Sequence, residues 1–202
     1  VELDADPQMP LLWLLRDEVD GTAGWTLVDC GIANDSTRAA WEQVFADELQ
    51  GLPVLRVICT HMHVAHVGWN TRLVDGAWVP TFPNARYLFV DREYEHWRSA
   101  PGLFGTEDVF GDSVAPIVEA GLSEMVPIDH ALGDSVRFQP TTGHTPGHVS
   151  VVIASGGQRA IITGDMVHSP LQIADPDLCS SFDTDSDEAR ATRRTVFPGW
   201  AD

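Results

Sequence analysis

The chain has 202 residues, of which 44% are hydrophobic and 21% charged, the composition of a globular protein with one well-buried core. Its formal net charge of −18 repels phosphate backbones, which argues against nucleic acid as a partner. No apolar run approaches the roughly 20 residues that a membrane-spanning helix needs, so we expect no membrane partner either.

Strand-like apolar runs and helix-like periodic segments alternate along the chain, separated by Gly, Pro and Asp turn signals. The expected strands lie at residues 11–15, 25–29, 54–59, 86–90, 135–139, 149–154 and 160–163. The expected helices lie at residues 37–49, 91–99 and 184–197, with one more helix and loops within 101–123. Mixed strands and helices without a linker or repeat predict a layered α/β architecture, with a single domain spanning residues 1–202.

The helix ends and surfaces give further expectations. Asp35 or Ser36 is expected to cap the helix at 37–49, since short polar side chains accept hydrogen bonds from the first helical N–H groups. Glu188 and the arginines within 190–194 are expected on the surface of the last helix, where charged side chains stay hydrated.

The three cysteines, Cys30, Cys59 and Cys179, show no paired spacing and cannot all pair within one chain. Cys30 and Cys59 end apolar strand-like runs and are expected in the core. Unpaired thiols fit a reducing compartment, and residues 1–10 lack the basic and apolar regions of a secretory leader. We therefore expect a cytoplasmic protein.

Three histidines gather in one segment that directly follows an expected strand. Residues 60–66 read Thr-His-Met-His-Val-Ala-His, which places His61, His63 and His66 in one loop. Neutral imidazoles crowded together gain little except as ligands, so this segment predicts a metal site.

Two later segments add candidate ligands. Residues 141–148 read Thr-Thr-Gly-His-Thr-Pro-Gly-His, and such a constrained turn can fix the direction of the His144 side chain. Residues 163–168 read Thr-Gly-Asp-Met-Val-His, in which Asp165 follows a strand and a glycine. A carboxylate in that position projects from the end of a sheet.

Together these segments resemble the metallo-β-lactamase fold superfamily, whose pattern is Thr-His-x-His-x-Asp-His, then Gly-His-Thr-Pro-Gly-His, then Gly-Asp. The likeness is close over residues 54–168, and the strand order fits from Leu11 onward. It implies a four-layer αββα sandwich of two mixed β-sheets flanked by helices. The family pattern also has a last histidine some tens of residues after the Gly-Asp, and none follows His168 here. We therefore expect that this ligand and the C-terminal part of the fold lie outside the chain, or that the ligand is replaced.

The resemblance implies a binuclear metal site. His61, His63 and His144 would hold one ion, and His66 and Asp165 would contribute to the second, with Asp165 shared between both. Up to two zinc ions are the expected cofactor, although Mn, Fe or Co fill similar sites of imidazole and carboxylate. His148 closes the second motif and is expected to orient a ligand or to be structural.

Position 65 departs from the pattern, because Ala65 stands where the family has Asp. Alanine binds no metal, and losing merely an outer partner of a ligand costs about 10–100-fold in metal affinity or activity. The missing carboxylate also leaves Asp165 as the one anionic ligand between two dications about 4 Å apart. In such sites this Asp orients the attacking hydroxide, so Ala65 marks a catalytic position. An inactivating substitution and a natural one-metal variant both explain it.

In the family, a metal-bound hydroxide attacks a carbonyl or phosphoryl centre. Asp165 rather than Cys argues against antibiotic hydrolysis, His63 rather than an acidic residue argues against a flavodiiron protein, and the acidic composition argues against a nuclease. Residues 164–172 and 185–194 look most like the branch of lactonases and methyl-parathion-hydrolase-like phosphotriesterases. His168 lies where lactonase-like relatives present a Tyr or His to the substrate; it is expected to be catalytic, with a structural role as the alternative.

The leading prediction is a zinc-dependent hydrolase of lactones or other small esters, impaired by Ala65. A phosphotriesterase or thioesterase of the same fold is one alternative. A non-catalytic metal-binding protein with a decayed site is another. The expected partner is a small-molecule ester or lactone, and the sequence allows a homodimer.

Overall fold

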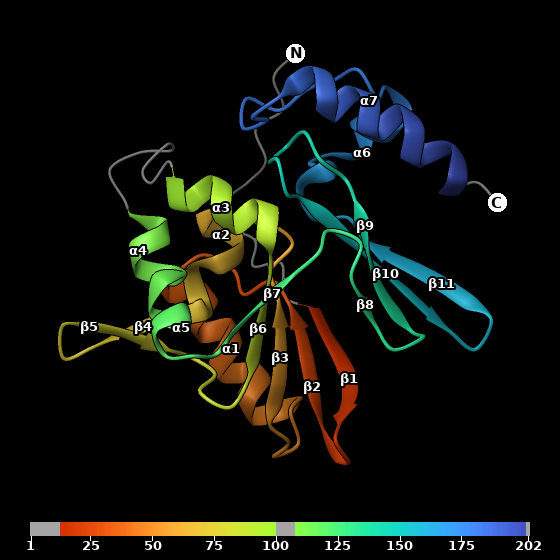
Figure 1. The fold of residues 1–202 in the computed structure, drawn as a ribbon. Helices are drawn as coiled ribbons and strands as arrows, with labels where there is room; N and C mark the ends of the chain where they lie inside the picture. Colours follow the sequence, from red (N-terminus) through yellow and green to blue (C-terminus); the bar gives the residue numbers. More distant parts are fainter. Residues whose placement is uncertain (1–12, 100–107, 201–202) are drawn as a thin grey trace. The chain divides into compact units, whose positions relative to one another are not determined.

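The computed structural model describes residues 13–99 and 108–200 and is drawn in Figure 1. The chain forms two compact units, which we describe separately. Within the described residues, the N-terminal unit comprises 13–89, 97–99 and 108–125, and the C-terminal unit comprises 90–96 and 126–200. The single domain predicted over residues 1–202 stays a prediction.

The N-terminal unit is built on a five-stranded sheet with the strand order β1-β2-β3-β6-β7. Its strands are β1 (Trp13–Val19), β2 (Thr22–Val28), β3 (Val54–Ile58), β6 (Arg86–Val90) and β7 (Ser123–Val126). β1 and β2 form the predicted hairpin, through a turn in which Asp20 and Gly21 have φ angles of 50° and 78°. β3 pairs in parallel with both β2 and β6, and its sequence is apolar except at Arg56, as expected of a central parallel strand.

Arg56, which interrupts the apolar run of β3, has its partner two strands away. Its guanidinium donates a hydrogen bond to Asp17 on β1, and Thr26 on β2 donates to the same carboxylate oxygen. Burial raises the pKa of Asp17, but the hydrogen bond from Thr26 and the charge of Arg56 outweigh it and hold that pKa below 3.8. The three side chains therefore tie three neighbouring strands together.

Replacing Asp17 with Asn is expected to lower the free energy of unfolding by about 1 kcal/mol at neutral pH. Because the folded-state pKa is lowered, the ionised carboxylate stabilises the fold above pH 3.8, and this contribution is lost as the pH falls through the lowered value. Urea denaturation at neutral pH and near pH 3 measures both effects. Asp20→Asn, at the exposed turn of the same hairpin, is the control; an equal loss in both variants would contradict the assignment.

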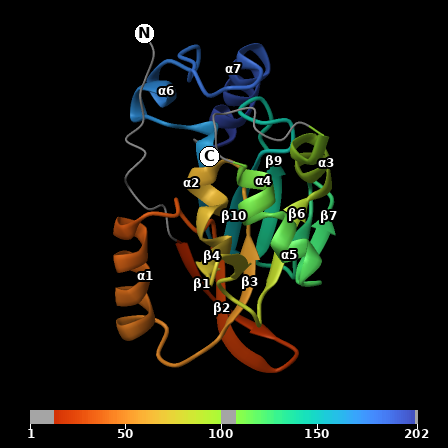
Figure 2. The ribbon, with the colours of Figure 1, turned by 90° about the vertical axis from the view of Figure 1, so that its left-hand side faces the viewer.

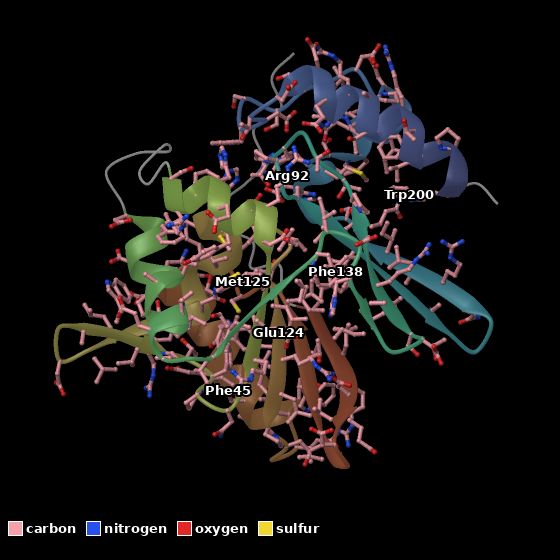
Figure 3. The ribbon with its side chains drawn as sticks, viewed as in Figure 1. Phe45, Arg92, Glu124, Met125, Phe138 and Trp200 are labelled. Carbon is pink, nitrogen blue, oxygen red and sulfur yellow. The ribbon has the colours of Figure 1, made fainter. Side chains whose placement is uncertain are left out.

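Helix α1 (Asp35–Asp47) lies on one face of this sheet, as the side view in Figure 2 shows. The predicted cap was wrong: Asn34 is the N-cap, because the helix begins at Asp35, and its side chain accepts from the Thr37 N–H at 2.8 Å. Trp41 is buried and donates to the Cys30 carbonyl oxygen, and its ring stacks on that of Phe45, labelled in Figure 3. The hydrogen bond from Trp41 to Cys30 anchors α1 to the segment that follows β2.

The other elements of the N-terminal unit are short. They are α2 (Val64–Val67), a 3-10 turn (Gly68–Asn70), the two-stranded ribbon of β4 (Thr71–Val74) and β5 (Ala77–Pro80), α4 (Val109–Ser113) and α5 (Ala115–Glu119). The helix α3 (Asp91–Ser99) has the predicted bounds and connects the two units. Of the helix and loops expected within 101–123, the part up to residue 107 lies outside the described residues, and the rest holds two separate helices.

The C-terminal unit contains a four-stranded antiparallel sheet in the order β11-β10-β9-β8. Its strands are β8 (Ala131–Leu132), β9 (Val136–Pro140), β10 (Val149–Ser155) and β11 (Gln158–Ile162). A two-residue turn joins β10 to β11, and its Gly156 and Gly157 both have positive φ angles, as a tight hairpin turn requires. The longer segment 141–148 joins β9 to β10. The 3-10 turn Gly164–Met166, α6 (Pro170–Ala174), α7 (Ser186–Val196) and the 3-10 turn Phe197–Trp200 follow.

The α/β architecture with two larger sheets and helices is confirmed, and the strands and long helices agree with the prediction to within a few residues. One surface assignment on α7 was wrong, because Arg193 is fully buried there. Cys30 and Cys59 are buried as expected, and all three cysteines are unpaired. No helix in the described ranges is both long and apolar enough to cross a membrane.

Candidate metal centre

The three histidines of the first motif lie together in the N-terminal unit. The chain leaves β3 at Ile58, and α2 begins at Val64, so the motif is a tight turn between a strand and a short helix. The His61 ring centroid lies 4.7 Å from that of His63 and 4.0 Å from that of His66, and His61 and His66 are buried. The three rings therefore form one compact cluster of candidate metal ligands.

Asp29, a residue that the sequence analysis missed, orients two of these rings. It directly follows β2, is 2% exposed, and accepts hydrogen bonds from the Thr60 N–H and hydroxyl. Its Oδ2 also lies 2.9 Å from His66 Nδ1, which makes that nitrogen the protonated one. Because the Thr60 hydroxyl donates to Asp29, the contact of 3.2 Å between Thr60 Oγ1 and His61 Nδ1 is a bond donated by His61. In both histidines Nε2 is therefore the nitrogen that is available to a metal.

Ala65 lies within α2, between His63 and His66, and is half-buried. Its methyl group adds no donor atom to the turn, so the N-terminal unit offers imidazoles at this motif and no carboxylate ligand from position 65. The Asp29 carboxylate does not replace it, because its oxygens are occupied by Thr60 and His66.

The second set of predicted ligands lies together in the C-terminal unit. His144 is buried in the turn between β9 and β10, and its Nε2 is 3.5 Å from Asp165 Oδ2. His168 Nε2 is 3.4 Å from the same oxygen. The structure thus brings His144, Asp165 and His168 into one cluster. Burial lowers the pKa of His144, which favours the neutral imidazole that a metal needs.

Asp183, also missed from the sequence, holds the other nitrogen of His144. Its side chain is fully buried, and its Oδ1 lies 3.1 Å from His144 Nδ1. Burial raises the pKa of Asp183, but hydrogen bonds from His144 and the Ser180 N–H outweigh it and keep that pKa below its ordinary value. An ionised Asp183 therefore places the His144 proton on Nδ1 and leaves Nε2 as the ligand atom.

The loop that carries Asp183 is fastened to the His144 turn. The N–H groups of Thr184 and Asp185 donate to the carbonyl oxygens of His144 and Gly143, both at 2.9 Å, where the β9–β10 turn approaches α7 (Figure 1). Gly143 has a φ angle of 121°, and a Cβ there would lie 2.2 Å from the Ala189 nitrogen. Only glycine permits this approach.

Arg193 supports the same loop from α7. It is fully buried and donates to the carbonyl oxygens of Pro176 at 3.0 Å and Leu178 at 2.8 Å. Its guanidinium also lies 3.9 Å from Asp183 Oδ2. A buried cation needs such partners, which explains why this arginine leaves the surface on which it was expected.

His148 positions the backbone of Asp165, in agreement with the orienting role expected from the sequence. The Asp165 N–H donates to His148 Nε2 at 3.0 Å, so this ring carries its proton on Nδ1. That proton is donated to Thr141 Oγ1, 2.9 Å away. Thr141 then donates to the Ser150 hydroxyl, which donates to the Thr163 carbonyl oxygen. Each donor has one acceptor, so the chain fixes the start of the turn that carries Asp165.

Comparison with known proteins identifies the family of this chain. Residues 6–199 match the Metallo-beta-lactamase superfamily. The chain belongs to this superfamily. The predicted family and its fold are thereby confirmed, while the ligand roles of individual residues stay predictions. No curated protein matches the sequence significantly.

Several solved structures resemble this superfamily member. The hydrolase AbOPH of the β-lactamase superfamily is 26% identical with a TM-score of 0.73, covering 88% of this chain and 65% of that one. A β-lactamase domain protein from Burkholderia ambifaria is 34% identical with a TM-score of 0.56, covering 77% and 48%. AidC, described as a dizinc quorum-quenching lactonase, is 23% identical with a TM-score of 0.68, covering 90% and 66%, and shows the fold alone. The chain thus spans between about half and two thirds of these relatives.

Both clusters suit a transition metal. Imidazole nitrogens with a carboxylate are ligands that zinc prefers, and Asp29, Thr60 and Asp183 hold Nδ1 of the three rings that they contact. Such outer hydrogen bonds fix ring orientation and raise ligand basicity. The residues present therefore fit a bound cation.

Proposed function

We propose that this chain is a metal-dependent hydrolase of lactones or other small esters, with zinc as its cofactor. The supporting observation is that Nδ1 of His61, His66 and His144 contacts Thr60, Asp29 and Asp183 respectively. These contacts leave Nε2 of each ring available to a metal. The lactonase AidC, which has the same fold, is the reason for the substrate class.

In this proposal His61, His63 and His144 hold one ion. His66 and Asp165 contribute to a second, with Asp165 shared. When bound, the metal supplies a Lewis acid that polarises a carbonyl and acidifies water to a pKa of about 7. Asp29 and Asp183 retain the imidazole protons at Nδ1, and His148 fixes the Asp165 backbone. The protein thereby presents ligands in one protonation state and one orientation.

Ala65 is proposed to impair this activity. The superfamily Asp at that position supplies a carboxylate ligand and accepts the proton of the attacking water. The methyl group of alanine can do neither. Asp165 then remains the anionic ligand of the proposed set, which weakens the neutralisation of two cations. We expect the chain to hold one ion more tightly than the other.

The proposal is tested by metal analysis of the purified chain together with hydrolysis of a panel of lactones, aryl esters, thioesters and phosphotriesters. Bound zinc and turnover of lactones or aryl esters would support it. Turnover confined to phosphotriesters or thioesters would contradict the substrate class and indicate another branch of the superfamily. Tightly bound metal without turnover, also after Ala65→Asp, would indicate a non-catalytic metal-binding protein.

A further inference from the structure

His168 is buried in the C-terminal unit, and its backbone is held by a neighbouring side chain. Its side chain is 4% exposed, and its backbone N–H donates to Gln172 Oε1 at 2.7 Å. Gln172 is itself fully buried and donates to the Leu178 carbonyl oxygen at 3.0 Å. The 3-10 turn that carries Asp165 is thus followed by a histidine whose place is fixed from α6.

The distances around Asp165 are too long for hydrogen bonds and suit a shared cation. Charge-assisted N–H···O bonds are about 2.7–2.9 Å long. The Nε2 atoms of His144 and His168 lie 3.5 and 3.4 Å from Asp165 Oδ2. Two ligands of a tetrahedral zinc ion, each bonded at about 2.0–2.1 Å, lie about 3.3–3.4 Å apart. Both distances to Asp165 Oδ2 match this separation of two ligands.

The surroundings of the two rings support the same interpretation. Asp183 Oδ1 lies 3.1 Å from His144 Nδ1, so Nε2 is the ring nitrogen that faces the Asp165 carboxylate. Neither ring nitrogen of His168 has a hydrogen-bond partner among the described residues, although both are buried. A buried imidazole nitrogen without such a partner is costly unless it binds a metal.

We propose that His168 is a metal ligand that shares one divalent cation with His144 and Asp165. This inference rests on the proposed function, because it adds a ligand to that metal site. It replaces the hydrogen bond to substrate expected from the sequence with a bond from Nε2 to the metal. His168 therefore contributes to metal affinity before any substrate is present.

The first test is calorimetric titration of the metal-free chain with Zn²⁺. His168→Gln is expected to weaken binding of the ion at this cluster by at least about tenfold. The control is His130→Gln, since His130 lies outside the cluster with its ring against Phe138. Circular dichroism of the metal-free variants compares their folding. Equal affinity and stoichiometry in His168→Gln and the unchanged chain would overturn the inference.

The second test places a thiolate at the same position. His168→Cys titrated with Co²⁺ is expected to show a thiolate-to-cobalt charge-transfer band that the unchanged chain and His130→Cys lack. Absence of this band in a folded variant that binds Co²⁺ would overturn the ligand role of position 168 while leaving the proposed function intact. Failure of the unchanged chain to bind either metal would instead reject both.

Discussion

Ala65→Asp is expected to raise the rate of ester or lactone hydrolysis by at least about 10–100-fold and to increase the amount of bound metal. The substitution returns a carboxylate to the turn that carries His63 and His66, on the half-buried first turn of α2. A second anion among the ligands offsets the mutual repulsion of two dications, and it also offers an acceptor for the proton of the attacking water. Metal analysis and kcat/KM on the same panel measure the two effects.

Ala65→Asn is the matched control, because its amide has the size of the carboxylate without its charge. A gain in the Asp form that the Asn form does not share assigns the effect to the missing anionic ligand. If the rate of hydrolysis rises equally in both variants, or in neither, the missing carboxylate at position 65 does not limit the activity. A natural one-metal site would then account for position 65 better than the loss of a catalytic carboxylate.

Local patterns were sufficient for most of the fold. The spacing of apolar residues, together with Gly, Pro and Asp turn residues, predicted the hairpin of β1 and β2, the strand β3 and the helix α3. Each of these elements depends on residues that are adjacent in sequence. The ribbon of β4 and β5 was missed although Asp75 and Gly76 form its turn with positive φ angles. Its strands have four residues each and are mostly exposed or half-buried, and they carry no alternation of apolar and polar residues.

The residues of the candidate metal centre also differ in how far the sequence reveals them. His61, His63, His66, His144 and Asp165 could be predicted as candidate ligands because their motifs are contiguous and rich in ligand types. Asp29 and Asp183 contact histidines 37 and 39 residues away, so tertiary structure alone reveals their partners. Asp29 had a weak signal, a carboxylate at the end of a buried strand, whereas Asp183 lies among several similar Asp residues.

Arg193 was placed on the surface because charged residues of a helix are usually solvated. The loop that follows Asp175 lies over this side of α7 instead, and its carbonyl groups need donors. One arginine with five N–H groups satisfies several of them at once. The error thus arises from a requirement of the loop backbone, which helical periodicity does not contain.

Asp183→Ala is expected to be the most damaging single change in the C-terminal unit. It removes the acceptor that fixes His144 Nδ1, so the ring can take the tautomer that is protonated on Nε2, and metal affinity is expected to fall about 10–100-fold. It also leaves Arg193 buried with one partner fewer, and breaking a buried pair in this way costs about 3–5 kcal/mol. Zinc titration and urea denaturation of the metal-free chain separate the two losses.

Two further variants show which contact matters. Asp177 lies on the same loop as Asp183 and forms an exposed ion pair with Arg194. Exposed pairs contribute little to stability, so Asp177→Ala should change neither the metal affinity nor the free energy of unfolding appreciably. Asp183→Asn keeps an oxygen that can accept from His144 but removes the charge, and it should retain more metal affinity than Asp183→Ala while remaining destabilised. Unchanged metal affinity in Asp183→Ala would mean that the packing of the turn, rather than this carboxylate, orients His144. The orientation of His144 would then depend on the backbone hydrogen bonds between its turn and the loop, and on the close approach of Gly143 to α7.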